Sequence, residues 1–305
     1  MDKHITIFYE EADYYVKEWE KKFEHGLKLK EYNKEKVNAI YRISFPYVIE
    51  ETDVKQYLFY TAETQTFVKE HFNKSLKEIA RLVKLNKLVL ITPSIQSAKA
   101  FTDNDIPVEI IPHGFDEDVY YIKENKEVNE VKTFLHVSSF CGNKNLNLII
   151  YSFINYNLHF NNNSKLVLKG NKIYDPLTKF YNIMKELYEK KLITIEQQMK
   201  TKDKIEVIVD DYNNEEMNDL YNSADVYIDG GVYEAFSMCV IEASACGLPV
   251  ICNKDAPLQD TTNFHFEDTN QLINLMKQDL KHKELDEKYN YKNIAKSLLD
   301  LFYKV

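Results

Sequence analysis

The sequence lacks the features that would place the protein in a membrane or outside the cell. It has no run of about 18 apolar residues, which a membrane-spanning helix needs, and its first residues show no apolar core of a signal peptide. We therefore expect a cytoplasmic protein. The net charge of -9 argues against a nucleic-acid partner, because phosphate backbones need a basic face. A local basic patch, and a peripheral membrane contact through it, is compatible with this charge.

Cysteine and glycine are both scarce. The four cysteines show no C-x-x-C spacing, so we expect free thiols in a reducing compartment and no metal site. Asp103 and Asp105 match a D-x-D metal pattern, but the Asx-rich stretch before Pro107 is more typical of a turn. Six of the seven glycines follow residue 113, so tight turns that a ligand can approach are concentrated in the second half.

Length and composition predict two globular domains of about 150 residues each. With 44% hydrophobic and 13% aromatic residues, the chain can bury two cores. Strands are predicted at residues 4–9, 39–45, 56–60, 87–92, 107–111, 133–137, 165–169, 205–209, 224–228 and 250–252. Helices are predicted at residues 11–37, 67–83, 146–156, 177–199, 215–222, 236–245 and 288–303. A further helical turn is predicted to begin at residue 98. Strands that alternate with helices indicate an α/β protein with mostly parallel sheets.

The stretch from Gly230 to Asn253 carries the strongest functional pattern. It reads as a loop with two glycines, a helix, a stop at Gly247 and Pro249, and a strand, directly after the strand at 224–228. A βαβ unit places such a loop at the carboxyl end of its strand, where open α/β sheets bind ligands. Free amides at the start of the helix favour an anion, and phosphate fits that position.

Two glutamates flank this predicted phosphate position. Glu234 lies in the loop and Glu242 lies on the helix, eight positions later. Because a phosphate repels a carboxylate, these side chains are better suited to hydroxyl groups on either side of it. Phosphate between two polyols describes a nucleotide sugar.

Glu234, Glu242 and the following A-S-A-C-G-L-P-V resemble the donor-site signature of the retaining glycosyltransferases of the GT-B fold, family 4. The resemblance implies two Rossmann-like domains with mostly parallel sheets that face a central cleft. We place an acceptor domain at residues 1–120 and a nucleotide-sugar domain at 121–287. A terminal helix at 288–305 would pack back on the first domain.

The resemblance also implies the roles of the site residues. Glu234 would contact hydroxyls of the donor sugar, and Glu242 would contact the ribose. The phosphates would bind the backbone of four residues, Ala235, Phe236, Ser237 and Met238. A UDP-sugar or GDP-sugar would be the donor, with no further cofactor and no metal.

The loop at 138–145 resembles the family's loop in which an arginine and a lysine grip the donor diphosphate. Lys144 matches the lysine, but Ser139 stands at the arginine position and cannot supply a bidentate guanidinium. Lys169 or Lys172 is a candidate substitute for that missing cation.

His113, in P-H-G-F-D at the end of the first domain, would face the cleft in the resembled fold, and we take it as a candidate catalytic residue. The alternative is that it positions the linker between the two domains, predicted at residues 117–130, with Gly114 required for the turn. The glycine-rich loop that the family has after its first strand is absent, and E-E-A-D-Y-Y stands in its place. The acceptor-binding residues are therefore not assigned.

The expected activity is a metal-independent, retaining hexosyl transfer from a nucleotide-diphosphate sugar to a glycan, lipid or protein acceptor. In the resembled enzymes the donor phosphate helps to take the acceptor proton, so no protein nucleophile is needed, and no Ser-His-Asp or Cys-His motif is present. Two alternatives remain: a non-catalytic nucleotide-sugar-binding subunit of a glycosyltransferase complex, and a nucleotide-sugar epimerase. The shared motif fixes neither base nor sugar, because selectivity depends on pocket shape.

Overall fold

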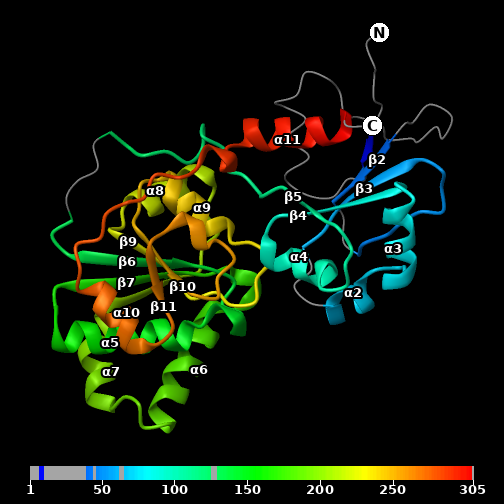
Figure 1. The fold of residues 1–305 in the computed structure, drawn as a ribbon. Coiled ribbons are helices and arrows are strands. Elements are labelled where there is room, and N and C mark those ends of the chain that lie inside the picture. Colours follow the sequence, from blue (N-terminus) through cyan, green and yellow to red (C-terminus); the bar gives the residue numbers. More distant parts are fainter. Residues whose placement is uncertain (1–6, 10–38, 44–45, 62–64, 125–128, 304–305) are drawn as a thin grey trace. The chain divides into compact units, whose positions relative to one another are not determined.

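The computed structural model describes residues 7–9, 39–43, 46–61, 65–124 and 129–303 (Figure 1). The chain forms two compact units. Unit 1 combines Met1–His113 with Tyr291–Val305, and unit 2 is Gly114–Asn290. The predicted helix at 11–37 and the segment E-E-A-D-Y-Y lie outside the described residues.

Unit 1 is built on a five-stranded parallel sheet in the order β1-β2-β3-β4-β5. Its strands are β1 (Ile7–Tyr9), β2 (Ala39–Arg42), β3 (Lys55–Phe59), β4 (Leu88–Thr92) and β5 (Glu109–Ile110). Its helices are α2 (Gln65–His71), α3 (Leu76–Lys84), α4 (Ile95–Thr102) and α11 (Tyr291–Tyr303). The buried strands β2 to β4 read as nearly continuous apolar runs, as expected for a parallel sheet covered on both faces.

Unit 2 is built on a six-stranded parallel sheet in the order β11-β10-β9-β6-β7-β8. Its strands are β6 (Lys132–Val137), β7 (Ser164–Lys169), β8 (Ile205–Ile208), β9 (Val226–Asp229), β10 (Val250–Asn253) and β11 (Phe264–Phe266). Its helices are α5 (Leu146–His159), α6 (Pro176–Glu189), α7 (Ile195–Thr201), α8 (Asn214–Asn222), α9 (Met238–Ala245) and α10 (Thr269–Met276).

The central strands β6 and β9 of unit 2 contribute side chains to two separate hydrophobic cores. Phe134 and Ile228 belong to a core with α5 and α10, whereas Leu135 and Tyr227 belong to a core with α9. This alternation follows from the two-residue period of a strand. The chain runs outward from β6 through β7 to β8, then returns to β9 and runs the other way. The order therefore reverses between β6 and β9, and the loops after these two strands meet at that switch point.

All ten predicted strands are present, but two predicted helices are wrong in extent, and one strand and one α-helix were not predicted. The helix predicted at 67–83 is two helices, because Ser75 caps α3 in a capping box with Glu78. The helix predicted at 177–199 breaks after α6, where Lys191 has a φ of 57° and Thr194 caps α7. Strand β11 and helix α10 carried no pattern that we recognised.

Helix α11 packs on the sheet of unit 1, although it is the last helix of the chain. Phe302 is 4% exposed and makes edge contacts with Tyr41 and Tyr57, at ring-centroid distances of 5.4 and 4.8 Å. None of the helices within the described ranges is both long and apolar enough to cross a membrane.

Truncating Phe302, the α11 side chain that packs on Tyr41 and Tyr57, should destabilise unit 1. We expect Phe302→Ala to cost about 3–5 kcal/mol of unfolding free energy, because it removes a buried ring and leaves a cavity. The matched variant Leu299→Ala lies on the same helix but is 37% exposed, and it should cost about 0.5 kcal/mol or less. Urea unfolding of both variants checks the difference, and equal costs would show that α11 does not anchor unit 1.

Candidate active site

The predicted donor residues of unit 2 meet at the carboxyl ends of β6 and β9. His136, buried in β6, joins the two strands, because its Nδ1 lies 2.8 Å from the carbonyl oxygen of Ile228 and its Nε2 lies 2.8 Å from Ser138 Oγ. A carbonyl only accepts, so Nδ1 carries the proton and Nε2 accepts from the serine hydroxyl. Burial lowers the pKa of His136, which favours this neutral form.

The loops after the two strands are interlocked. The amide of Val232 donates to the carbonyl of Asn143 at 2.9 Å, and Asn145 Nδ2 donates to the carbonyl of Gly230 at 3.0 Å. A Cβ at position 230 would lie only 2.6 Å from the carbonyl oxygen of Lys144. Glycine at 230 therefore lets the two backbones approach, and this approach brings the 138–145 loop to the motif loop.

Lys144 and Glu234 form an ion pair across these loops. Their Nζ and Oε1 atoms lie 2.6 Å apart, and the two side chains are 19% and 6% exposed. Burial alone would lower the pKa of Lys144, but the Glu234 carboxylate and a contribution from Asp229 leave it raised. The sequence had placed both residues in one site without predicting that they pair.

The start of α9 offers backbone amides beside this pair. Ser237 is the N-cap residue, but its side chain makes no capping hydrogen bond. The first amides of a helix have no partner within the helix, so they are available to an anion. Ala235 and Ser237 are buried, while Phe236 and Met238 are partly exposed. Cys239, in the first turn, has its pKa raised to about 12 by burial and stays a thiol at neutral pH.

Glu242 lies one turn further along α9 and is held by tyrosines. Its Oε2 accepts a hydrogen bond of 2.7 Å from the buried hydroxyl of Tyr221, and Tyr120 also donates to the carboxyl group. Burial raises the pKa of Glu242 against the opposing effect of these two donors. Neither tyrosine was singled out from the sequence, because both are remote from the motif and carry no local pattern.

Ser139 stands at the position where the resemblance expects an arginine, and Lys169 and Lys172 are the candidate substitutes for that cation. Ser139 Oγ donates to Cys141 Sγ at 3.2 Å and stays within its own loop. Lys169, at the end of β7, is 6% exposed, its Nζ donates to the carbonyl of Gly170, and its own carbonyl accepts from the amide of Ser138 in the 138–145 loop at 3.0 Å. Lys172 is exposed and forms an ion pair with Asp211. Of the two candidate substitutes, Lys169 therefore lies closer to the donor residues.

His113 belongs to unit 1, whereas every other predicted site residue belongs to unit 2. Its ring centroid lies 5.0 Å from that of Phe59. Burial lowers the pKa of His113 to about 4, so the imidazole is neutral at pH 7.

Asp229 is a further site residue that the sequence did not single out. It ends strand β9 at 2% exposure, and its Oδ1 accepts a hydrogen bond of 3.0 Å from the amide of Gly231. An acidic residue at the end of an apolar strand was the signal that could have revealed it. The bond fixes the turn from which Glu234 projects.

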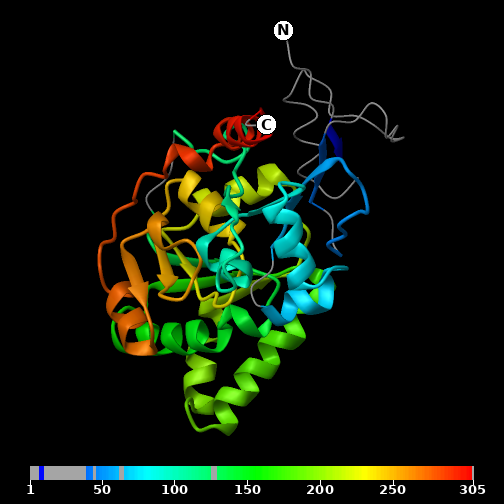
Figure 2. The same ribbon diagram turned by 45° about the vertical axis from the view of Figure 1, so that its right-hand side comes forward.

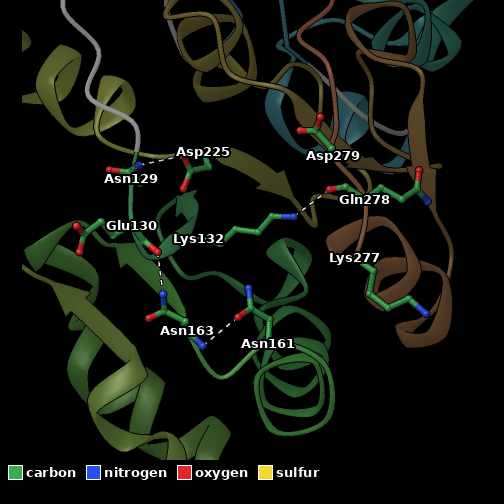
Figure 3. Close-up of a pocket in the computed structure, with 9 residues that line it drawn as sticks. All are labelled: Asn129, Glu130, Lys132, Asn161, Asn163, Asp225, Lys277, Gln278 and Asp279. Carbon is green, nitrogen blue, oxygen red and sulfur yellow. Dashed lines mark hydrogen bonds between the residues drawn. The ribbon is translucent and has the colours of Figure 1, made fainter.

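Figure 3 shows a polar pocket at the opposite, amino-terminal edge of the same sheet. Lys132 Nζ points across it and donates to the carbonyls of Met276 and Gln278 at 2.8 and 2.9 Å, while Asn129 donates to Asp225. The ammonium group of Lys132, at the centre of this pocket, is thus already hydrogen-bonded to the end of α10. Since parallel sheets bind ligands at their carboxyl ends, we assign this pocket no part in the donor site.

Comparison with known proteins places this site in a family context. A family model described as "Glycosyl transferases group 1" matches residues 120–294. The chain is 26% identical over 283 residues to a protein named probable sucrose-phosphate synthase from Thermosipho melanesiensis. The match covers 87% of this chain and 58% of that protein, so the chain spans little more than half of the relative's length.

Solved structures show the same fold. Sucrose-phosphate synthase from Thermosynechococcus elongatus matches with a TM-score of 0.64 and 18% identity, over 88% of this chain and 73% of that chain. A glycosyltransferase from Rickettsia africae matches with a TM-score of 0.65 and 15% identity, over 99% of this chain and 90% of that chain. Anabaena Alr3699/HepE, in complex with UDP-glucose, matches with a TM-score of 0.61 and 14% identity, over 88% of this chain and 79% of that chain. The predicted GT-B fold class is thereby confirmed.

Proposed function

The chain belongs to the glycosyl transferases group 1 family, and from that premise we propose that it transfers a sugar, with retention, from a nucleotide-diphosphate sugar bound to unit 2. The observation that carries this proposal is the Lys144–Glu234 pair beside the start of α9, whose first backbone amides have no partner within the helix. A cation and a helix start suit a diphosphate. A buried carboxylate next to them suits the hydroxyls of the attached sugar.

In the proposed complex the donor spans three groups. Lys144 and the amides near Ser237 and Met238 hold the diphosphate, Glu234 accepts hydrogen bonds from sugar hydroxyls, and Glu242 accepts them from the ribose. Because Tyr221 and Tyr120 already orient the Glu242 carboxylate, its position does not depend on the donor. The HepE structure with UDP-glucose supports a UDP-sugar as the donor.

Lys169 is our proposed replacement for the arginine that Ser139 lacks. The amide of Ser138 donates to the carbonyl of Lys169 at 3.0 Å, so Lys169 adjoins the loop that carries Lys144. A lysine provides a point charge rather than a bidentate fork, so the diphosphate would be held less rigidly. The two lysines and the helix amides would supply the positive charge that a metal gives in other transferases.

The proposed reaction needs no protein nucleophile. The acceptor hydroxyl oxygen forms a bond to the anomeric carbon on the face from which the diphosphate leaves, and the bond from that carbon to the diphosphate oxygen breaks. A phosphate oxygen of the leaving group takes the acceptor proton. The acceptor, a glycan, lipid or protein, would be met by unit 1, where neutral His113 is our candidate acceptor-side residue.

The first test is a thermal-shift panel of nucleoside diphosphates and nucleotide sugars. One diphosphate and its sugar conjugates should raise the melting temperature, since a ligand at about 100 times its Kd stabilises by about 2.7 kcal/mol. Transfer to an acceptor, undiminished by a chelator, then supports the transferase. Binding without turnover would favour a non-catalytic subunit, and conversion of the donor without an acceptor would favour an epimerase. No shift with any compound would contradict the proposal.

The glycine at 231 gives a sharper test of the sugar contact. A Cβ there would lie 2.4 Å from Glu234 Oε1, so Gly231→Ala must displace the carboxylate. We expect transfer to fall on the order of 10²-fold, because a misplaced group loses its alignment. Gly142→Ala in the neighbouring loop is the control, since a Cβ at 142 meets no atom within 4 Å. Equal activity of the two variants would refute a positional role for Glu234.

A further inference from the structure

A buried histidine near the carboxyl end of β6 takes part in a chain of three hydrogen bonds that runs into the 138–145 loop. His136 is fully buried, and its Nδ1 donates to the carbonyl of Ile228 on β9. Its Nε2 accepts the hydroxyl proton of Ser138, and Ser138 Oγ in turn accepts from the amide of Phe140 at 3.1 Å. All three bonds point in the same direction, so each one polarises and strengthens the next.

Phe140 adopts a backbone conformation that needs such support. Its φ of 57° lies in the left-handed region, which is unfavourable for a bulky residue. Its ring is 4% exposed and packs in the core that contains the residues of α5, so both its side chain and its amide are held. The 138–145 loop therefore turns at Phe140, two residues after the serine that accepts from its amide.

Lys144 follows Phe140 through a single tight turn. Its amide donates to the carbonyl of Cys141 at 3.0 Å in the short 3-10 helix η1 (Gly142–Lys144). Asn145 ends the loop with a second left-handed φ of 51°, and α5 then runs along one face of the sheet of unit 2 (Figures 1 and 2). Because this turn leaves little freedom, a change of backbone direction at Phe140 would move the ammonium group of Lys144.

We propose that His136 is a positioning residue for the donor diphosphate, because it accepts the Ser138 hydroxyl proton and so sets the path of the loop that places Lys144. This inference rests on the proposed donor function. The imidazole is fully buried, so it would act through Lys144 and not by touching the donor. The position of Lys144 carries more weight here than in a site with a guanidinium, since Ser139 supplies no second cation.

Two substitutions separate the two hydrogen bonds of the imidazole. Asparagine can place its amide nitrogen near the position of Nδ1, so His136→Asn keeps a donor for Ile228 and loses the acceptor for Ser138. Glutamine reaches the position of Nε2, so His136→Gln keeps the acceptor and loses the donor. Each variant loses one buried hydrogen bond, and both should lower the melting temperature by similar amounts.

Titration with UDP should distinguish these two variants. We expect His136→Asn to bind UDP about tenfold more weakly than the unchanged protein, and His136→Gln to bind it within about twofold, because only the asparagine frees the loop. Ser138→Ala should behave like His136→Asn, since it also removes the bond to the Phe140 amide. Equal binding by the asparagine and glutamine variants would overturn the proposal.

Ser164→Ala is the matched control for the loss of a serine hydroxyl. Ser164 is buried at the start of β7, at the opposite edge of the sheet, and its Oγ donates to the carbonyl of Asn161 at 2.7 Å. The variant should lower the melting temperature without changing the affinity for UDP. A loss of UDP binding equal to that of Ser138→Ala would show that general destabilisation explains both, and would overturn the proposal.

The double variant His136→Asn/Lys144→Met tests whether the histidine acts through the lysine. It should bind UDP as weakly as Lys144→Met alone, and fully additive losses would contradict the proposal. Hydrogen exchange without ligand gives an independent readout: amides of the 138–145 loop should exchange faster in His136→Asn and Ser138→Ala, but not in His136→Gln. If the unchanged protein bound no UDP, the proposed UDP donor would fail, and the exchange data would still decide whether His136 holds the loop.

Discussion

Replacing Glu234 with glutamine should lower sugar transfer on the order of 10²- to 10³-fold, comparable to the loss of one preorganised electrostatic group in other active sites. The side chain keeps its size but loses the negative charge that accepts hydrogen bonds from sugar hydroxyls. Binding of the free nucleoside diphosphate should persist or become tighter. The reason is that Glu234 holds the Lys144 ammonium at 2.6 Å and competes with a phosphate for it.

The measurement is a pair of titrations, one with the nucleoside diphosphate and one with its sugar conjugate, together with the initial rate of transfer. Glu206→Gln is the control, since Glu206 also pairs with a lysine but is 46% exposed at the strand β8. It should leave all three quantities within about twofold, because exposed pairs contribute little. Full transfer by Glu234→Gln would eliminate the mechanism proposed for this site. If the affinities for the nucleoside diphosphate and for its sugar conjugate fell equally, Glu234 would instead have a role in folding of the loop.

The local parts of this site were predictable from the sequence. Apolar runs ended by polar or glycine residues gave the ten strands, since a buried parallel strand needs little more than such a run. The two glutamates and the helix start between them lie within one stretch of chain, so spacing alone placed them together. Lys144 was assigned to the same site through the resemblance of the 138–145 loop to the family's diphosphate-binding loop.

The non-local parts were not predictable. Tyr221 donates to Glu242 across 21 positions, and Tyr120 reaches the same carboxyl group from the start of unit 2. Such contacts depend on how α8 packs on α9, which no periodic pattern records. The break between α6 and α7 was missed for another reason: apolar spacing continued through Leu192, and a positive φ at a lysine outweighed local helix propensity.

Removing the charge of Lys144 should have two effects that can be separated. Lys144→Met leaves the Glu234 carboxylate buried without its partner ammonium, and we expect a loss of about 3–5 kcal/mol in unfolding free energy. It should also weaken nucleoside diphosphate binding about 10- to 100-fold, because a charge-assisted hydrogen bond to the phosphate is lost. Lys172→Met, which removes an exposed lysine paired with Asp211, should change neither quantity appreciably.

The double variant Lys144→Met/Glu234→Gln separates stability from binding. It removes both charges of the pair, so the buried carboxylate charge is lost together with the Lys144 ammonium, and most of the lost stability should return. Diphosphate binding should remain as weak as in Lys144→Met, because neither new side chain carries a positive charge. If binding returned together with stability, Lys144 would act only by holding the loop, and the diphosphate would depend on Lys169 and the amides of α9. If neither returned, the methionine itself would disrupt the interlocked loops, and Lys144→Gln would replace it as the probe.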